Sequence, residues 1–232
     1  MSDANYCNRK LRQPMEDPLE WVSWAWNWLH SQWLRTTYPF ASVGRDLSVH
    51  CTCELRRPHA VGMKLGNSVL IAPGVWLNVA DEANLDAPVI VLDDRVRIGR
   101  WTQISAKNCI HLERDVSISP SVLLMDHNHS YSDPRLPVEK QGLTTGGQIR
   151  IECGCWIGHG AAIICGHGQL VIGRNSVVAA NALVTRSFPA YCVIAGNPAR
   201  IVKQWDGADQ RWVLGAARPA EAATLPQEAA VS

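Results

Sequence analysis

Aliphatic residues recur at intervals of six along the middle of the chain. They open twelve six-residue units, at Leu65, Ile71, Leu92, Ile98, Ile104, Leu112, Ile118, Ile151, Ile157, Ile163, Ile172 and Val178. The fifth position of ten units is small or β-branched, and only Asn108 and His167 depart from that rule. Such a period is typical of a coil of three short parallel strands, because its narrow triangular interior admits one aliphatic side chain per side and a small one near each corner. The sequence therefore predicts a mainly β protein, a parallel β-helix whose stacked coils bury a continuous aliphatic column.

The period is interrupted in three places. It lapses over residues 78–87 and within residues 125–148, and the spacing from Ile163 to Ile172 is nine residues instead of six. A long unpatterned excursion within a compact domain is commonly functional. We therefore expect residues 125–148 to protrude as a loop. The third interruption predicts a short bulge around His167, for which a tolerated surface insertion is the favoured interpretation.

A Trp-rich segment precedes the repeats. Asp17-Pro18 followed by Glu20 resembles a helix start, so a helix is predicted from about 18 to 36. Its apolar residues cover more than half of the circumference, which is broader than one buried stripe; they are Trp21, Val22, Trp24, Ala25, Trp26, Trp28, Leu29 and Trp33. We expect this helix to pack on the coil or on a neighbouring subunit. Peripheral contact with a membrane is the alternative, although the polar face offers only His30 and Arg35 in place of a basic row.

The chain is expected to divide into three parts. Residues 1–60 hold the helix and a lead-in segment, residues 61–204 the β-helix, and residues 205–232 a tail that is partly disordered because its Ala-, Pro- and Glu-rich sequence has little to bury. The segment from Asn197 to Lys203 predicts a turn that leads into a short C-terminal capping helix.

Composition and charge narrow the function. The chain has 22 Lys and Arg against 21 Asp and Glu and no long run of one sign, so we expect no nucleic acid partner. No stretch has the roughly 18 uninterrupted apolar residues of a transmembrane segment. The polar start lacks the apolar core of a secretory signal, which predicts a cytoplasmic protein whose eight cysteines are reduced thiols. The pairs Cys51–Cys53 and Cys153–Cys155 lack the partners of a zinc site, so no metal is expected.

The longer interruption opens with two imidazoles in a polar loop, His127 and His129. A neutral imidazole, with a pKa of about 6.5, suits general-base work at neutral pH, and the neighbouring carboxylate of Asp126 is a candidate to orient it. No Ser or Cys nucleophile motif accompanies the pair. Direct transfer between two bound substrates is therefore favoured over a covalent enzyme intermediate.

Together these features resemble the hexapeptide-repeat O-acetyltransferases, most closely those that acetylate sugars and bacterial surface polysaccharides. The resemblance rests on the repeats, the Asp126–His129 loop and three segments near the C-terminal end, Ile149–Gly160, Ile172–Arg186 and Val193–Arg200. It covers about residues 60–205. It implies a left-handed parallel β-helix, a homotrimer with active sites between subunits, and acetyl-CoA as co-substrate along the coil.

The same resemblance implies the roles of individual residues. A loop histidine would deprotonate an acceptor hydroxyl for attack on the thioester, with His127 as the first candidate and His129 as its rival. The implied cofactor-binding residues are Trp156 beside the acetyl end of the pantetheine arm, His159, the small Ala161 and Ala180, and the basic Arg186, Arg200 and Lys203 at the CoA phosphates. The expected enzyme moves an acetyl group to a hydroxyl of a sugar or surface-polysaccharide precursor.

Two alternatives remain open. The γ-class carbonic anhydrases share the coil and bind zinc through three histidines, and the sequence around His159 resembles their ligand strand, although the residue five positions on is Ile164. A triad of His127, His129 and His159 would be needed for such a zinc enzyme. The other alternative is a non-catalytic trimeric scaffold in which the Trp-rich helix recruits a partner.

Overall fold

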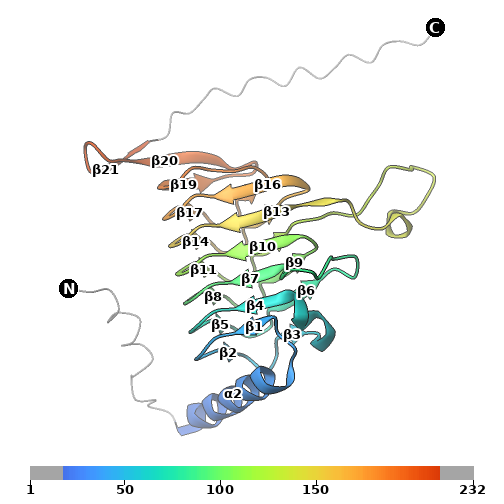
Figure 1. Ribbon diagram of the computed structural model, residues 1–232. Helices are drawn as coiled ribbons and strands as arrows, with labels where there is room; N and C mark the ends of the chain where they lie inside the picture. The colour runs from blue at the N-terminus through green and yellow to red at the C-terminus, as the bar shows by residue number, and fades with distance from the viewer. Residues whose placement is uncertain (1–17, 215–232) are drawn as a thin grey trace.

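Three parallel β-sheets form the walls of a prism in the computed structural model, which describes residues 18–214 (Figure 1). Each coil adds one strand to each sheet in turn. The first sheet contains β1 (Ser42–Val43), β4 (Met63–Leu65), β7 (Ile90–Leu92), β10 (Cys109–Leu112), β13 (Gly146–Ile151) and β16 (His167–Ile172). The third contains β3 (Glu54–Leu55), β6 (Trp76–Val79), β9 (Gln103–Ala106), β12 (Leu123–Met125), β15 (Ala162–Ile164) and β18 (Leu183–Val184).

The second sheet is longer because the chain ends on it. It contains β2 (Ser48–Val49), β5 (Leu70–Ile71), β8 (Arg97–Ile98), β11 (Ser117–Ile118), β14 (Trp156–Ile157), β17 (Val177–Val178), β19 (Cys192–Ala195), β20 (Arg200–Asp206) and β21 (Arg211–Leu214). The remaining elements are helix α2 (Pro18–Thr37) and the 3-10 helices η1 (Arg57–Gly62) and η2 (Val138–Gln141).

The aliphatic period is the reason for this architecture. All twelve residues that open the repeats are buried, with at most 3% of any one exposed. They stack in register: Leu92 pairs with Leu65 below it and with Leu112 above it. Because burial of one such side chain stabilises the fold by about 1.5–3 kcal/mol, the three columns are the main source of stability. The predicted mainly β, parallel fold is confirmed.

The fifth positions of the repeats obey the same rule. The ten small or β-branched residues are buried, whereas Asn108 and His167 are exposed. Cys155 is one of the ten, and burial raises the pKa of its thiol to about 12. This cysteine fills space in the core, as its position in the repeat predicts.

Iodoacetamide at pH 8 is expected to alkylate the exposed Cys51 of the native protein and to leave Cys155 unmodified. The reactive species is the thiolate, and a thiol with so high a pKa stays protonated at pH 8. Peptide mass spectrometry checks the result, with urea-unfolded protein as the control in which both residues react. Equal modification of the two in the native state would show that the coil is open around Cys155.

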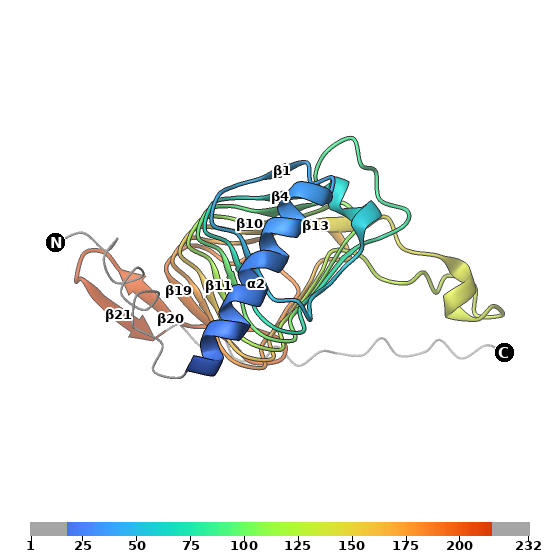
Figure 2. The same cartoon turned by 90° about the horizontal axis from the view of Figure 1, so that it is seen from below.

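The long connections leave the prism at one edge, where the chain passes from the third sheet to the first; we call it the loop edge. They are η1, residues 80–89 and residues 126–145, and they gather on one side when the coil is viewed along its axis (Figure 2). Residues 126–145, the arm, carry η2 and project farthest from the body. The predicted loop over 125–148 is therefore present, although its ends are already part of β12 and β13.

The coil starts earlier than the boundary at residue 61. Strands β1, β2 and β3 form a complete first coil inside the segment expected as a lead-in. Val43, Val49 and Leu55 pair with Leu65, Ile71 and Leu77 of the next coil. These three residues are themselves six apart, so the period already begins at Val43.

The predicted C-terminal capping helix is wrong. Residues Arg200–Asp206 form β20, which pairs antiparallel with β19 and turns back through β21. The last parallel strand leaves a row of unpaired backbone groups, and a hairpin satisfies them where a helix would not. Trp205 and Trp212 contact edge to face across the hairpin, with ring centroids 5.6 Å apart. Residues 205–214 are thus an ordered hairpin, and the rest of the expected tail lies outside the described residues.

The bulge predicted around His167 is also absent. The extra residues lengthen β16, which pairs in unbroken register with β13 from Gly146–His167 to Ile151–Ile172. Because β10 begins opposite Gln148, the pairs Gly146–His167 and Gly147–Gly168 extend these two strands beyond the coil below.

Helix α2 confirms the predicted helix over 18–36, while its expected N-cap Asp17 lies outside the described residues. It crosses the N-terminal end of the coil (Figure 2) and packs there through polar side chains and the buried Leu34. The Val49 N–H, which points away from the next coil, donates to Ser31 Oγ at 2.9 Å, and Cys51 N–H donates to Asn27 Oδ1 at 3.3 Å. Within residues 18–214 no helix has the length and hydropathy needed to cross a bilayer.

Replacing Gly158 by alanine is expected to destabilise the coil by about 1–3 kcal/mol, as overpacking does. A Cβ there would lie 2.6 Å from the backbone nitrogen of Ala180 in the next coil. For a unit of this size the Tm should fall by roughly 2–4 °C per kcal/mol, which thermal unfolding followed by circular dichroism measures. Gly207→Ala, where nothing lies within 4 Å, is the control. A Gly158→Ala protein as stable as the control would mean that the coils are not in close contact there.

Candidate active site

Asp126 and His127 form a hydrogen-bonded pair at the loop edge, directly after β12. Asp126 Oδ1 lies 2.9 Å from His127 Nδ1, and both side chains are buried, with 6% of His127 exposed. With Nδ1 donating to the carboxylate, Nε2 is the nitrogen that can accept a proton. The pair therefore has the chemistry of an oriented general base.

The carboxylate of Asp126 is held by the backbone of the coil below. Its Oδ1 accepts the N–H of Lys107 at 2.7 Å, and its Oδ2 accepts the N–H groups of Asn108 and Cys109, both at 2.9 Å. Burial, followed by the nearby charge of Asp126, raises the pKa of the Cys109 thiol. The acceptor atoms of Asp126 are thus fixed by three main-chain donors, and they in turn fix the plane of the imidazole.

Side chains of the same turn tie the arm to the prism. Lys107 Nζ donates to Thr144 O at 2.8 Å and to Glu82 Oε2 at 2.9 Å, and this ammonium holds the pKa of Glu82 below its ordinary value. Asn108 Nδ2 donates to Thr145 O at 2.9 Å. The returning segment of the arm is therefore anchored to the coil below.

His129 lies farther out along the arm. It is exposed, and its backbone forms an antiparallel bridge with Leu143. The structure thus brings His127 together with Asp126 and separates His129 from them.

The predicted cofactor residues are spread over other parts of the prism. Trp156 is exposed on the second sheet, where its indole N–H donates to Ser119 Oγ at 3.0 Å, and His159 and Ala180 are exposed at the edge between the second and third sheets. Arg200 and Lys203 are exposed on β20. Within one chain, all five lie away from the loop edge.

Arg186 and Ala161 differ from the rest of that set. Arg186 is exposed where the chain leaves β18, at the loop edge, and its guanidinium carbon lies 5.3 Å from the ring centroid of Phe188. Ala161 is fully buried, and its N–H and C=O bond to Gly158 and Leu123 inside the coil. The side chain of Ala161 thus faces the core, as an alanine in the fifth position of a repeat does, and its contact with the cofactor stays a prediction.

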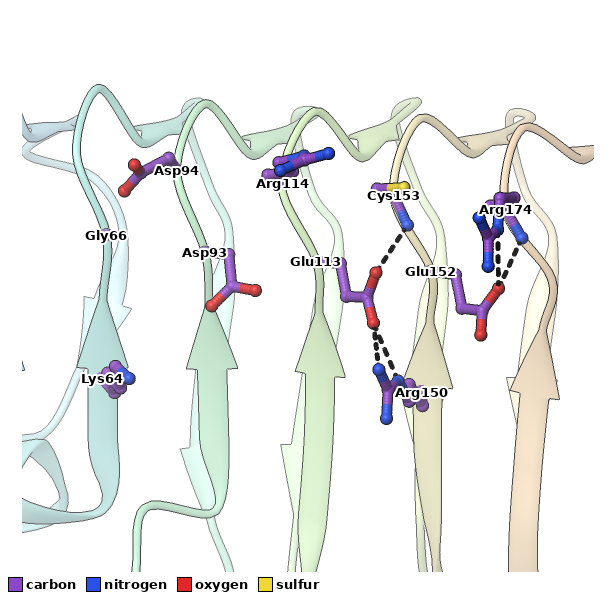
Figure 3. Close-up of a pocket in the computed structure, with 10 residues that line it drawn as sticks. All are labelled: Lys64, Gly66, Asp93, Asp94, Glu113, Arg114, Arg150, Glu152, Cys153 and Arg174. Carbon is purple, nitrogen blue, oxygen red and sulfur yellow. Dashed lines mark hydrogen bonds and ion pairs between the residues drawn. The ribbon is translucent and has the colours of Figure 1, made fainter.

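A charged groove of about 580 Å³ follows the edge between the first and second sheets (Figure 3). Its carboxylates tie successive coils together: Glu113 accepts the N–H of Cys153 at 3.0 Å, and Glu152 accepts the N–H of Arg174 at 2.9 Å. Burial opposes the ionisation of Glu113, but Arg150 and the Cys153 N–H outweigh it and lower its pKa. Because its charges compensate one another, this groove is a structural ladder of ion pairs and does not have the chemistry of an anion site.

The structure places two of the three histidines of the zinc alternative apart. His127 lies at the loop edge and His159 at the edge between the second and third sheets. Among residues 18–214, no group of three or more His, Cys, Asp or Glu side chains is arranged to hold a metal ion.

Lys107, Asn108, Thr144 and Glu82 were not predicted from the sequence. One signal pointed to them: Asn108 breaks the fifth-position rule, as does His167, whose backbone is paired with Gly146 at the end of the arm. Both departures flank the Asp126–His127 pair.

Sequence comparisons connect the chain to acetyltransferases. No protein-family model matches it. WbbJ of Escherichia coli strain K12, named as a lipopolysaccharide biosynthesis O-acetyl transferase, is 30% identical over 131 residues, which are 53% of this chain and 65% of WbbJ. A Mycobacterium tuberculosis protein named as an acetyltransferase is 27% identical over 187 residues, 78% of this chain and 54% of the relative. The chain thus spans between about half and two thirds of the length of these curated relatives.

Structural comparisons agree. A hexapeptide-repeat acetyltransferase of Vibrio cholerae, solved with acetyl-CoA, is 26% identical with a TM-score of 0.52, over 62% of this chain and 72% of that one. AntD, an N-acyltransferase of Bacillus cereus solved with dTDP and CoA, has a TM-score of 0.60 over 77% of this chain and 90% of AntD, and at 17% identity it shows the fold alone. The chain therefore has the hexapeptide-repeat fold, and its resemblance to the hexapeptide-repeat acetyltransferases is confirmed.

Proposed function

We propose that the protein transfers the acetyl group of acetyl-CoA to a hydroxyl of a sugar or surface-polysaccharide precursor, with His127 as the general base. The observation that carries this proposal is the buried Asp126–His127 pair, whose carboxylate is held by three backbone N–H groups. The names of the sequence relatives support the reaction class.

The proposed reaction is a direct transfer. Nε2 of His127 takes the proton of the acceptor hydroxyl while the oxygen attacks the thioester carbonyl. The C–S bond then breaks, and the imidazolium returns its proton to the CoA thiolate. Asp126 keeps the imidazole in the tautomer that accepts at Nε2 and stabilises the imidazolium that forms, as the carboxylate of a Ser-His-Asp triad does.

The proposed site is shared between copies of the chain. Trp156, His159 and Ala180 lie on surfaces away from the loop edge, so one chain cannot present them to its own His127. We propose a homotrimer in which the loop edge of one copy faces the cofactor-binding surface of the next. Light scattering measures the stoichiometry. Co-expression of His127→Ala with Trp156→Ala tests the shared site, because mixed trimers would regain intact sites that neither variant forms alone.

An acceptor screen tests the proposed reaction. The purified protein is incubated with acetyl-CoA and a panel of free sugars, nucleotide sugars and oligosaccharides, and free thiol and the mass of each acceptor are measured. The expected result is acceptor-dependent thiol release with a gain of one acetyl unit that mild alkali removes, as it removes esters. An alkali-stable product would show N-acetylation instead. Absence of acceptor-dependent thiol release, or stoichiometric zinc by elemental analysis, would contradict the proposal.

A further inference from the structure

Helix α2 has its polar and apolar faces reversed relative to an ordinary surface helix. Its buried or half-buried face carries Asn27, His30 and Ser31, which bond to the backbone of the first coil, together with Leu34. This face satisfies the N–H and C=O groups that the first coil cannot pair with a coil below it. The apolar side of the helix is therefore turned away from the protein.

The outward face is apolar and large. More than half of each of its side chains is exposed, and they are Trp21, Val22, Trp24, Trp26, Trp28, Leu29 and Trp33. At 3.6 residues per turn they cover an arc of roughly 200°. Because a Trp side chain buries about 150–250 Å², five half-exposed indoles leave on the order of 500 Å² of aromatic surface in water. A patch of this size is as large as the largest on a typical monomeric protein, and such patches are often functional.

The size and shape of this surface decide between partners. A stable protein interface buries about 800 Å² on each side, and a single convex helix at the extreme end of the molecule offers less than that (Figure 1). Lipids can surround both flanks of a convex helix, whereas a protein partner would need a groove of matching shape. A hollow of about 250 Å³ has room for part of an acyl chain but not for another helix, and it is lined by Trp26, Leu29, His30 and Trp33.

The scarcity of charged residues in α2 also favours a lipid bilayer as the partner. From Trp21 to Leu34 the helix has no Asp, Glu, Lys or Arg, so along this stretch no charge has to leave water when the face enters an apolar medium. Arg35, in the last turn, donates to Gln32 Oε1 at 3.0 Å. Trp is the side chain that concentrates at the boundary between headgroups and acyl chains. An interfacial helix normally turns its polar face to water, and here the end of the coil takes the place of water.

We propose that α2 lies in the plane of a lipid bilayer, with its indoles at the boundary between headgroups and acyl chains and the coil standing away from the membrane. The loop edge runs along the coil, so Asp126 and His127 remain off the membrane and open to substrates. The proposal does not depend on acetyl transfer, and its test and the activity assay can fail separately.

Vesicle binding tests this proposal. The full chain is mixed with phosphatidylcholine vesicles and separated by flotation, and Trp emission is followed with brominated lipids as quenchers. The expected result is flotation without any anionic lipid, with quenching of Trp emission. A variant with Trp21, Trp24, Trp26, Trp28 and Trp33 replaced by alanine should bind at least tenfold more weakly. Alanine keeps the helix propensity, and circular dichroism confirms the fold.

Trp101→Ala is the matched control, because Trp101 is as exposed as the helix indoles but lies on the side of the prism. It should bind vesicles as the original protein does. Failure of the original protein to float, or equal binding by the five-Trp variant, would overturn the proposal. A changed oligomeric state of the five-Trp variant in light scattering, with vesicle binding unchanged, would assign this face to contacts between copies of the chain instead.

Discussion

Replacing His127 by alanine is expected to lower kcat for acetyl transfer by about 10²–10⁴-fold, the usual contribution of a positioned general base, with little change in the KM for acetyl-CoA. The imidazole acts on the acceptor proton in the transition state, so its loss removes rate and not cofactor binding. Thiol release at saturating acetyl-CoA measures the effect. The role proposed for His127 rests on the engagement of its Nδ1 by a buried carboxylate.

His129→Ala is the matched control for that prediction. The two imidazoles are separated by one residue, but His129 is exposed and pairs only its backbone with Leu143. Its replacement should leave kcat nearly unchanged. A larger loss of kcat in His129→Ala than in His127→Ala would identify His129 as the base. Unchanged kcat in both variants would show that neither histidine of the arm takes part in the reaction.

Replacing Asp126 by asparagine is expected to lower the free energy of unfolding by about 1–3 kcal/mol, the cost of leaving a buried hydrogen-bond donor without its acceptor. Both carboxylate oxygens accept main-chain N–H groups, at Lys107, Asn108 and Cys109. The side-chain amide of asparagine has one oxygen and one NH₂ group. Whichever way it is turned, its NH₂ group faces at least one of these N–H groups, and that buried donor is left without an acceptor. The Tm should fall by roughly 2–12 °C for a unit of this size, and kcat should fall as well because the imidazole loses its orientation.

Asp133→Asn is the control for this stability effect. The Asp133 carboxylate also accepts a cluster of hydrogen bonds, from the backbone N–H and the guanidinium of Arg135, but on the surface of the arm. Surface substitutions usually change stability by no more than about 0.5 kcal/mol, so its Tm should stay close to that of the original protein. An Asp126→Asn protein with an unchanged Tm would show that the carboxylate is not anchored as described.

The fold could be predicted because one aliphatic side chain in each six-residue unit determines it. A six-residue period places every aliphatic residue in a column, and all twelve predicted positions are buried. The first coil escaped prediction although Val43, Val49 and Leu55 continue the period, because polar and cysteine residues fill the positions between them. The C-terminal hairpin escaped for a different reason: the sequence after Arg200 suits a helix or a strand, and the open edge of β19 decides between them.

The candidate site was predictable only in part. Asp126 and His127 are neighbours in sequence, and a carboxylate beside an imidazole in an interrupted repeat is a readable signal. Lys107 and Asn108 come from the previous coil, and only the stacking of coils brings their N–H groups under Asp126. The two exceptions to the fifth-position rule, Asn108 and His167, indicate where the site lies. Each is too large and polar for the core and is exposed beside the turn that carries Asp126.

The two ends of the coil are closed by different elements, and this governs self-association. A parallel β-helix has three open strand edges at each end, which could template the next molecule and grow into a filament. At one end, side chains of α2 occupy the outward N–H of Val49 and that of Cys51. At the other, the reversal of direction at β20 ends the parallel ladder of the second sheet. Head-to-tail extension of the second sheet is therefore opposed by polar capping at one terminus and by a change of strand polarity at the other.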